Sequence, residues 1–147
     1  MPTGVTVVTA TASSGPIGVA IGSFVSISLA PPLVGFFLGN QSGSGIGLRE
    51  AGSFCVNILG PAQLDLCADM ASRADDKFAR WEWSSSSATG SPVFPGINAY
   101  VDCELHDIVS IGDHDLFVGR VLDLNTIAGG EPMVFHTGRY GSFGAVG

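Results

Sequence analysis

The sequence has very little positive charge. Six lysine and arginine residues stand against 13 aspartates and glutamates, and Lys77 is the single lysine. Without a basic stripe there is nothing to follow a phosphate backbone, so the charge balance argues against nucleic-acid binding. A phosphate-bearing ligand would depend on backbone N–H groups, hydroxyls and an arginine.

Long hydrophobic runs and clustered metal ligands are also missing. The longest apolar run, around 33–38, is far too short to cross a membrane, and Met1-Pro2-Thr3 lacks the basic region of a signal peptide. His106 and His136 show no metal-ligand spacing, which argues against a zinc site. The three cysteines include no CxxC pair and indicate buried thiols in a reducing compartment: Cys55, Cys67 and Cys103. We therefore expect a cytoplasmic protein.

The chain does have enough apolar residues for an ordinary core. Its 147 residues are 46% hydrophobic, with nine phenylalanines, and predict one domain over residues 1–147. Charged residues make up only 13% of the chain. Such a sparsely charged, apolar surface favours burial against a second copy, and we expect a homodimer.

Short apolar segments separated by turn residues predict a mainly β protein with small inserted helices. The expected strands are 5–11, 17–21, 33–38, 54–59, 99–109, 116–125 and 133–136. One short helix is expected over 46–51, ended by Gly52, and a second opens at Pro61. Six or seven mostly antiparallel strands close most simply as a Greek-key barrel.

Two details of this pattern make finer predictions. In the second helix, one face carries the side chains expected to be buried: Leu64, Cys67, Ala68 and Ala71. The low-complexity stretch 84–91 is expected to be a solvated loop.

Two motifs carry the functional signal. The run Ser23-Phe24-Val25-Ser26-Ile27-Ser28-Leu29-Ala30-Pro31-Pro32-Leu33 places three small hydroxyls ahead of a double proline. Its partner is the turn Gly112-Asp113-His114. Together they resemble the flavin reductase-like family of flavin-binding split barrels, and the resemblance runs from the segment at 4–9 to the segment at 135–140.

The resemblance implies a split β-barrel that binds FMN, with FAD as an alternative, in a groove between two subunits. It implies hydride transfer from NADH or NADPH to that flavin, and release of reduced flavin to a separate oxygenase. Two other functions stay open: a flavin-dependent oxidoreductase acting directly on a small organic substrate, and a non-catalytic flavin-binding protein. Because the first predicted strand begins at residue 5, the chain is expected to lack the longer N-terminal segment usual in the family.

The serine run is expected to line the flavin. The resemblance assigns flavin contacts to Ser23, Phe24, Ser26 and Ser28. The alternative is that these hydroxyls satisfy backbone groups of an irregular strand. Family members often carry threonine and serine at the positions of Ala20 and Gly22, so side-chain contacts are lost there.

Ser42 and Ser44 precede the first predicted helix, where hydroxyls and free N–H groups form a phosphate cradle. Ser44 could instead serve only as an N-cap, and Arg49 could neutralise the phosphate or simply lie on the surface. Gly43 and Gly45 replace bulkier family residues and weaken the helix.

His114 is the candidate catalytic residue. Its imidazole lies in a turn between two aspartates, at the start of a strand and so at the rim of the predicted barrel. In the family this histidine lies beside the nicotinamide; the alternative is an ordinary turn histidine. The resemblance also offers Phe78 as a shield of the ring face, and Arg139 and Tyr140 as flavin or dimer contacts, with structural roles equally open.

Overall fold

The computed structural model describes residues 1–147. The main strands are β2 (Thr6–Ala12), β3 (Gly15–Ile21), β4 (Val25–Leu29), β5 (Pro32–Gly39), β6 (Ser53–Ile58), β9 (Ala99–Ile111) and β10 (His114–Thr126). Shorter strands are β1 (Thr3–Gly4), β7 (Ser84–Ser85), β8 (Pro92–Val93), β11 (Met133–His136) and β12 (Arg139–Ser142). The helices are α1 (Gly43–Ala51), η1 (Pro61–Gln63) and α2 (Leu64–Ala71). None of them is long and apolar enough to cross a membrane.

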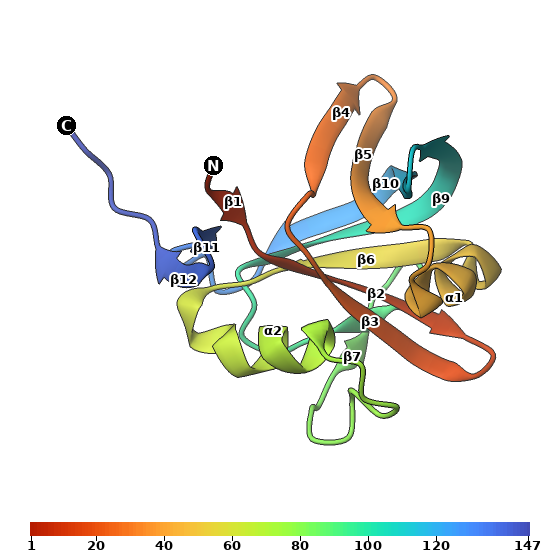
Figure 1. Ribbon diagram of the computed structural model, residues 1–147, viewed down its shortest axis with the longest axis horizontal. Helices are drawn as coiled ribbons and strands as arrows, with labels where there is room; N and C mark the ends of the chain where they lie inside the picture. Colours follow the sequence, from red (N-terminus) through yellow and green to blue (C-terminus); the bar gives the residue numbers. More distant parts are fainter.

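The main strands form one antiparallel sheet that curls into a barrel (Figure 1). Their order is β3-β2-β6-β9-β10-β5-β4, so neighbours in the sheet are often distant in the sequence. The long pair β9–β10 shifts register after Val118 and again after Val121. Such irregularities bend a sheet and increase its twist, and β3 approaches β5 across the barrel. The predicted mainly β barrel with small helices is confirmed.

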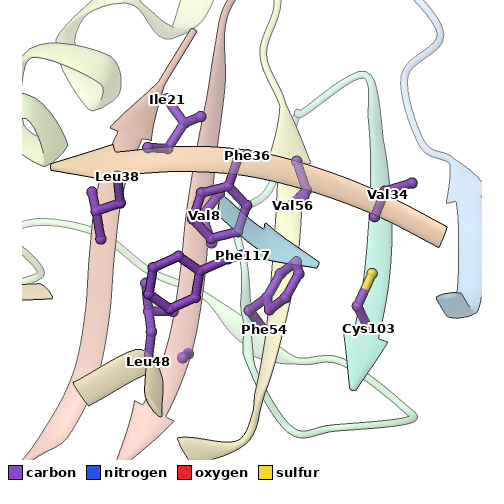
Figure 2. Packing of buried hydrophobic residues seen from close by; sticks show 11 residues of the cluster. Val8, Ile21, Val34, Phe36, Leu38, Leu48, Phe54, Val56, Cys103 and Phe117 are labelled. Carbon is purple, nitrogen blue, oxygen red and sulfur yellow. The ribbon is translucent and has the colours of Figure 1, made fainter. Parts of the chain in front are cut away.

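Phenylalanines fill the barrel interior (Figure 2). Phe36 on β5 stacks on Phe117 of β10 with ring centroids 5.3 Å apart, and meets the edge of Phe54 at 5.1 Å. All three rings are fully buried. Gly119 faces this layer, where a Cβ would come within 2.4 Å of the Phe54 ring, so the bent strand can pass the ring only without a side chain.

Helix α2 covers a second apolar cluster, but with a different face from the predicted one. Its buried residues are Leu66, Cys67 and Met70. Of the four residues predicted to be buried, only Cys67 is; Leu64 is 44% exposed, and Ala68 and Ala71 are exposed. The helix places its longer apolar side chains inward because Leu66 and Met70 together remove more apolar area from water than the two alanines would.

The serine-rich segment 84–91 is not a solvated loop throughout. Ser86 and Ser91 are buried, and Asp102 on β9 is fully buried beneath the segment. The Asp102 carboxylate accepts the Thr89 hydroxyl at 2.6 Å and the backbone N–H groups of Ala88 and Thr89. A buried carboxylate requires such donors. The small hydroxyl residues therefore fold inward to satisfy it, which the low-complexity pattern did not predict.

Candidate functional site

Two adjoining cavities run along β3, between the start of α1 and the chain that follows α2. They share Gly43, Ser44, Ala74 and Lys77 as lining residues, and we call them together the α1–β3 groove. One, the serine cavity, has a volume of about 800 Å³ and includes Ser42 and Arg73. The other, the acidic cavity, has about 630 Å³ and includes Glu50, Asp75 and Asp76. A smaller cavity of about 260 Å³ continues past Ala20 and Ala71 to Tyr140.

Helix α1 points its first turn at the groove. The helix begins at Gly43, earlier than predicted, so Ser44 belongs to its first turn instead of the preceding loop. Ser42 is the N-cap, but its side chain makes no capping hydrogen bond. The first N–H groups of a helix have no acceptor within the helix. Free N–H groups, the positive helix end and two serine hydroxyls therefore meet at one wall, as an anion requires.

The glycines around α1 have distinct structural roles. Gly45 is buried, and a Cβ there would come within ordinary contact distance of Leu38 and Phe117. The helix start therefore packs closely on the barrel. Gly52 ends the helix in the left-handed conformation, with φ of 66°, as the sequence predicted.

Lys77 lies on the opposite wall and was missed by the sequence analysis. Its ammonium donates to the carbonyl oxygen of Gly18 on β3 at 3.0 Å and to that of Met70 on α2 at 2.8 Å. Burial lowers the pKa of Lys77. An ammonium has three donors, so one donor is left over, and Lys77 lines the same two cavities as Ser44. The usable signal was that the one lysine in an acidic chain directly precedes Phe78.

Close packing against β3 fixes the wall that carries Lys77. A Cβ on Gly18 would lie 2.5 Å from the Met70 sulfur and 3.0 Å from the Phe78 ring, so any side chain at this strand position would force Met70 to shift. Farther along the wall, Asp69 accepts hydrogen bonds from Arg80 at 2.6 Å and from the Trp81 indole at 2.8 Å. The segment after α2 is thus tied to β3 through Lys77, and back to α2 itself through Arg80 and Trp81.

His114 lies at the barrel rim, outside the groove but beside the loop that leads into α1. It is the first residue of β10 and pairs with Gly39, while the N–H of Asn40 donates to the Asp113 carbonyl at 3.0 Å. The imidazole is half-exposed, with Nδ1 2.7 Å from the Asp113 carboxylate. This hydrogen bond lowers the pKa of Asp113, and with Nδ1 engaged, Nε2 is left for another partner.

The serine run lies away from the groove. The Ser23 hydroxyl accepts the N–H of Phe37 at 2.9 Å and donates to its carbonyl at 3.3 Å. That is the backbone role left open in the sequence analysis. Ser26 is exposed and Ser28 half-buried on the edge strand β4. Phe24 packs against the core and lines a separate cavity of about 140 Å³.

Arg49 faces a carboxylate. It pairs with the largely buried Asp115 at 2.7 Å and lies over the Phe117 ring at 5.4 Å. Asp115 also accepts the Ser110 hydroxyl at 2.8 Å. The Arg49 guanidinium is therefore already engaged by the Asp115 carboxylate.

The remaining candidates are divided between the cavities. Phe78 lines the acidic cavity while stacking on Phe94 at 5.6 Å. Tyr140 lines the small cavity, where its hydroxyl lies 3.7 Å from the sulfur of Cys67. Arg139 is exposed beside it on β12. The structure thus brings Ser42, Ser44 and Phe78 together in one groove and leaves the others around it.

Comparisons with known proteins agree with this geometry. Residues 1–144 match the flavin reductase like domain. A flavin reductase of Pseudomonas putida is 41% identical, over 99% of this chain and 85% of its own length. The reductase subunit HsaB of a Rhodococcus jostii flavin-dependent monooxygenase is 41% identical, over 94% of this chain and 70% of its own length.

A solved structure extends the match to three dimensions. The Streptomyces globisporus C-1027 NADH:FAD oxidoreductase SgcE6, in complex with NAD and FAD fragments, superposes with a TM-score of 0.92 and 33% identity. The superposition covers 98% of this chain and 87% of SgcE6. Both the sequence and the fold therefore place this chain in the flavin reductase-like domain family.

Proposed function

We propose that this protein supplies reduced FMN to a separate flavin-dependent oxygenase. Family membership makes it an NAD(P)H:flavin oxidoreductase. The observation that supports a phosphate-bearing flavin is the α1–β3 groove, where hydroxyls, free N–H groups and one ammonium converge. The reductase-subunit relative HsaB supports the oxygenase partner.

The phosphate fits the wall at the start of α1. Ser42 and Ser44 present hydroxyls there, the first turn presents N–H groups, and Lys77 lines the same cavity. A dianionic phosphate needs several donors that are already fixed in place. The single phosphate of FMN could use these donors, and so could the pyrophosphate of FAD.

Hydride passes from nicotinamide C4 to flavin N5, and the protein's task is to hold the two rings in contact. No protein nucleophile is needed. We propose that His114 contacts and positions the nicotinamide, because its Nε2 has no partner and Asp113 fixes the orientation of the imidazole. Ser26 and Ser28 on β4, together with Ser23 and Phe24 just before it, are proposed to follow the flavin ring where a partner subunit closes over that edge. Arg139 and Tyr140 are proposed to contact the flavin from the other rim.

A homodimer is proposed from the exposed apolar side chains. They lie on the edge strand β4, at the end of β9 and in the last part of β10: Val25, Ile27, Leu29, Val109, Ile111, Leu122 and Leu124. Exposed large apolar side chains in this number are typical of a protein that buries part of its surface against a partner. The three free, buried cysteines fit the expected cytoplasmic location.

The test compares FMN with riboflavin, which lacks the phosphate. We expect Ser44→Glu to remove the affinity advantage of FMN while leaving riboflavin binding unchanged, because a carboxylate would occupy the phosphate position. Ser53→Glu, on a half-buried serine outside the groove, is the matched control. An undiminished preference for FMN in Ser44→Glu would place the phosphate elsewhere, and flavin binding without NAD(P)H oxidation would refute the reductase function.

A further inference from the structure

The acidic cavity is not explained by FMN binding. Beyond the shared residues Gly43, Ser44, Ala74 and Lys77, it extends for about 630 Å³ to the β2–β3 turn and the last turn of α1. A side chain at Gly43 would find no atom within 4 Å of its Cβ. The passage between the two cavities is therefore open at this glycine, and a ligand held by phosphate in the serine cavity can continue into the acidic one.

The two ends of the groove carry opposite charge. Arg73 and the two serines line the serine cavity, whereas Glu50, Asp75 and Asp76 line the acidic one. Lys77 stands between them. A phosphate is favoured at the first end and repelled at the second.

Glu50 is oriented for a neutral hydrogen-bond donor. Its Oε1 accepts the backbone N–H of Ser13 at 3.0 Å and also the Ser13 hydroxyl. These bonds lower the pKa of Glu50, so the carboxylate is charged at neutral pH. Oε2 has no partner within the chain and remains available for hydroxyl groups, such as the paired hydroxyls of a ribose.

Apolar side chains supply a surface for a flat base in the same cavity. Ile46 is 74% exposed, and Ile17 and the Phe78 ring line the wall near it. Stacking of a base on such side chains needs no particular hydrogen bonds. The cavity thus offers a base surface, a ribose acceptor and, next door, a phosphate wall.

We propose that the acidic cavity binds the adenosine half of a dinucleotide and rejects a ribose that carries a 2′-phosphate. The proposal rests on the assigned phosphate wall of the reductase. NADH and FAD both carry an adenosine whose ribose is unphosphorylated at the 2′ position. NADPH carries a 2′-phosphate there, which the carboxylates of this cavity repel. A carboxylate that accepts ribose hydroxyls is a general means of preferring the unphosphorylated nucleotide.

The test begins with a binding measurement that needs no catalysis. ADP-ribose and its 2′-phosphate are titrated into the intact protein, with Glu50→Gln as the variant. Glutamine keeps an oxygen for Ser13 and removes the charge. We expect the wild type to prefer ADP-ribose and Glu50→Gln to reduce that preference by roughly fivefold, the effect of losing one nearby charge in water.

Glu104→Gln is the matched control, since Glu104 is exposed on β9 and lines neither cavity. Equal preferences in Glu50→Gln, Glu104→Gln and wild type would overturn the proposal. Two measurements on Glu50→Gln show whether the bound adenosine belongs to FAD or to NADH. If FAD binds more weakly while FMN affinity is unchanged, the adenosine is that of FAD. If the ratio of kcat/KM for NADH to kcat/KM for NADPH falls, the adenosine is that of NADH. If the wild-type protein prefers ADP-ribose over its 2′-phosphate but does not reduce flavin with NAD(P)H, the reductase function is refuted and the adenosine site stands.

Discussion

Replacing Lys77 by methionine separates a structural role from a binding role. The change keeps most of the side-chain length and removes the ammonium, so the carbonyls of Gly18 and Met70 lose the donor that now lies 3.0 Å and 2.8 Å away. Hydrogen bonds from a charged group contribute about 1.5–3 kcal/mol each. Because the side chain is half-buried and water can replace the donor in part, we expect the free energy of unfolding to fall by about 2 kcal/mol.

The same substitution should weaken FMN selectively. Loss of one charge-assisted hydrogen bond to the phosphate should weaken FMN binding roughly tenfold. Riboflavin has no phosphate, so its affinity should not change. Fluorescence titration with both flavins measures the difference, and urea denaturation without flavin measures the stability. Lys77→Arg retains the charge and should restore much of the FMN preference.

Arg120→Met is the control for general loss of charge, since Arg120 is exposed on β10 and lines neither cavity of the groove. The reasoning would be refuted if Lys77→Met kept full FMN preference and full stability. Reduced stability with an unchanged ratio of FMN to riboflavin affinity would leave Lys77 as a structural tie and remove it from the phosphate wall.

Three further perturbations test the proposed role of His114, the packing of the core and the stability in acid. His114→Ala should keep its flavin yet reduce it with NAD(P)H roughly tenfold more slowly; wild-type rates in stopped-flow experiments would make His114 an ordinary turn residue. Phe36→Ala should lower the free energy of unfolding by about 3–5 kcal/mol, measured by urea denaturation, and a loss below 1 kcal/mol would contradict the packing on Phe117. Hydrogen bonds from Arg80 and Trp81 lower the pKa of Asp69 below 3.8, so its stabilisation is present above that pH and lost as the pH falls through the folded-state pKa. Asp69→Asn should therefore flatten the acid limb of the stability profile, and an unchanged limb would contradict the assignment.

The sequence by itself determined most of the long strands, the presence of the two helices and the glycine that ends α1. Gly52 ends α1 as predicted, because a left-handed residue at a helix end is a local requirement that glycine meets. The predicted strands at 33–38 and 133–136 fall within β5 and coincide with β11. Alternation, turn residues and caps act between neighbours in the chain, so the sequence carries them directly.

The sequence also placed Ser42 and Ser44 at a helix start, although α1 begins earlier than the pattern indicated. The error has a physical cause: Gly43 and Gly45 have low helix propensity, but packing of Gly45 against Leu38 and Phe117 stabilises the first turn. Tertiary contacts routinely override such local preferences.

Only the tertiary structure decided which chemical groups meet. Lys77 lines the same cavity as Ser44 because its hydrogen bonds to Gly18 on β3 and Met70 on α2 hold it there. Ser23 bonds the backbone of Phe37, and Asp102 draws the serine segment inward, through partners that lie 14 and 13 residues away in the chain. No local pattern encodes these pairings, since each depends on the sheet order that closes the barrel and on the need to satisfy every buried polar group.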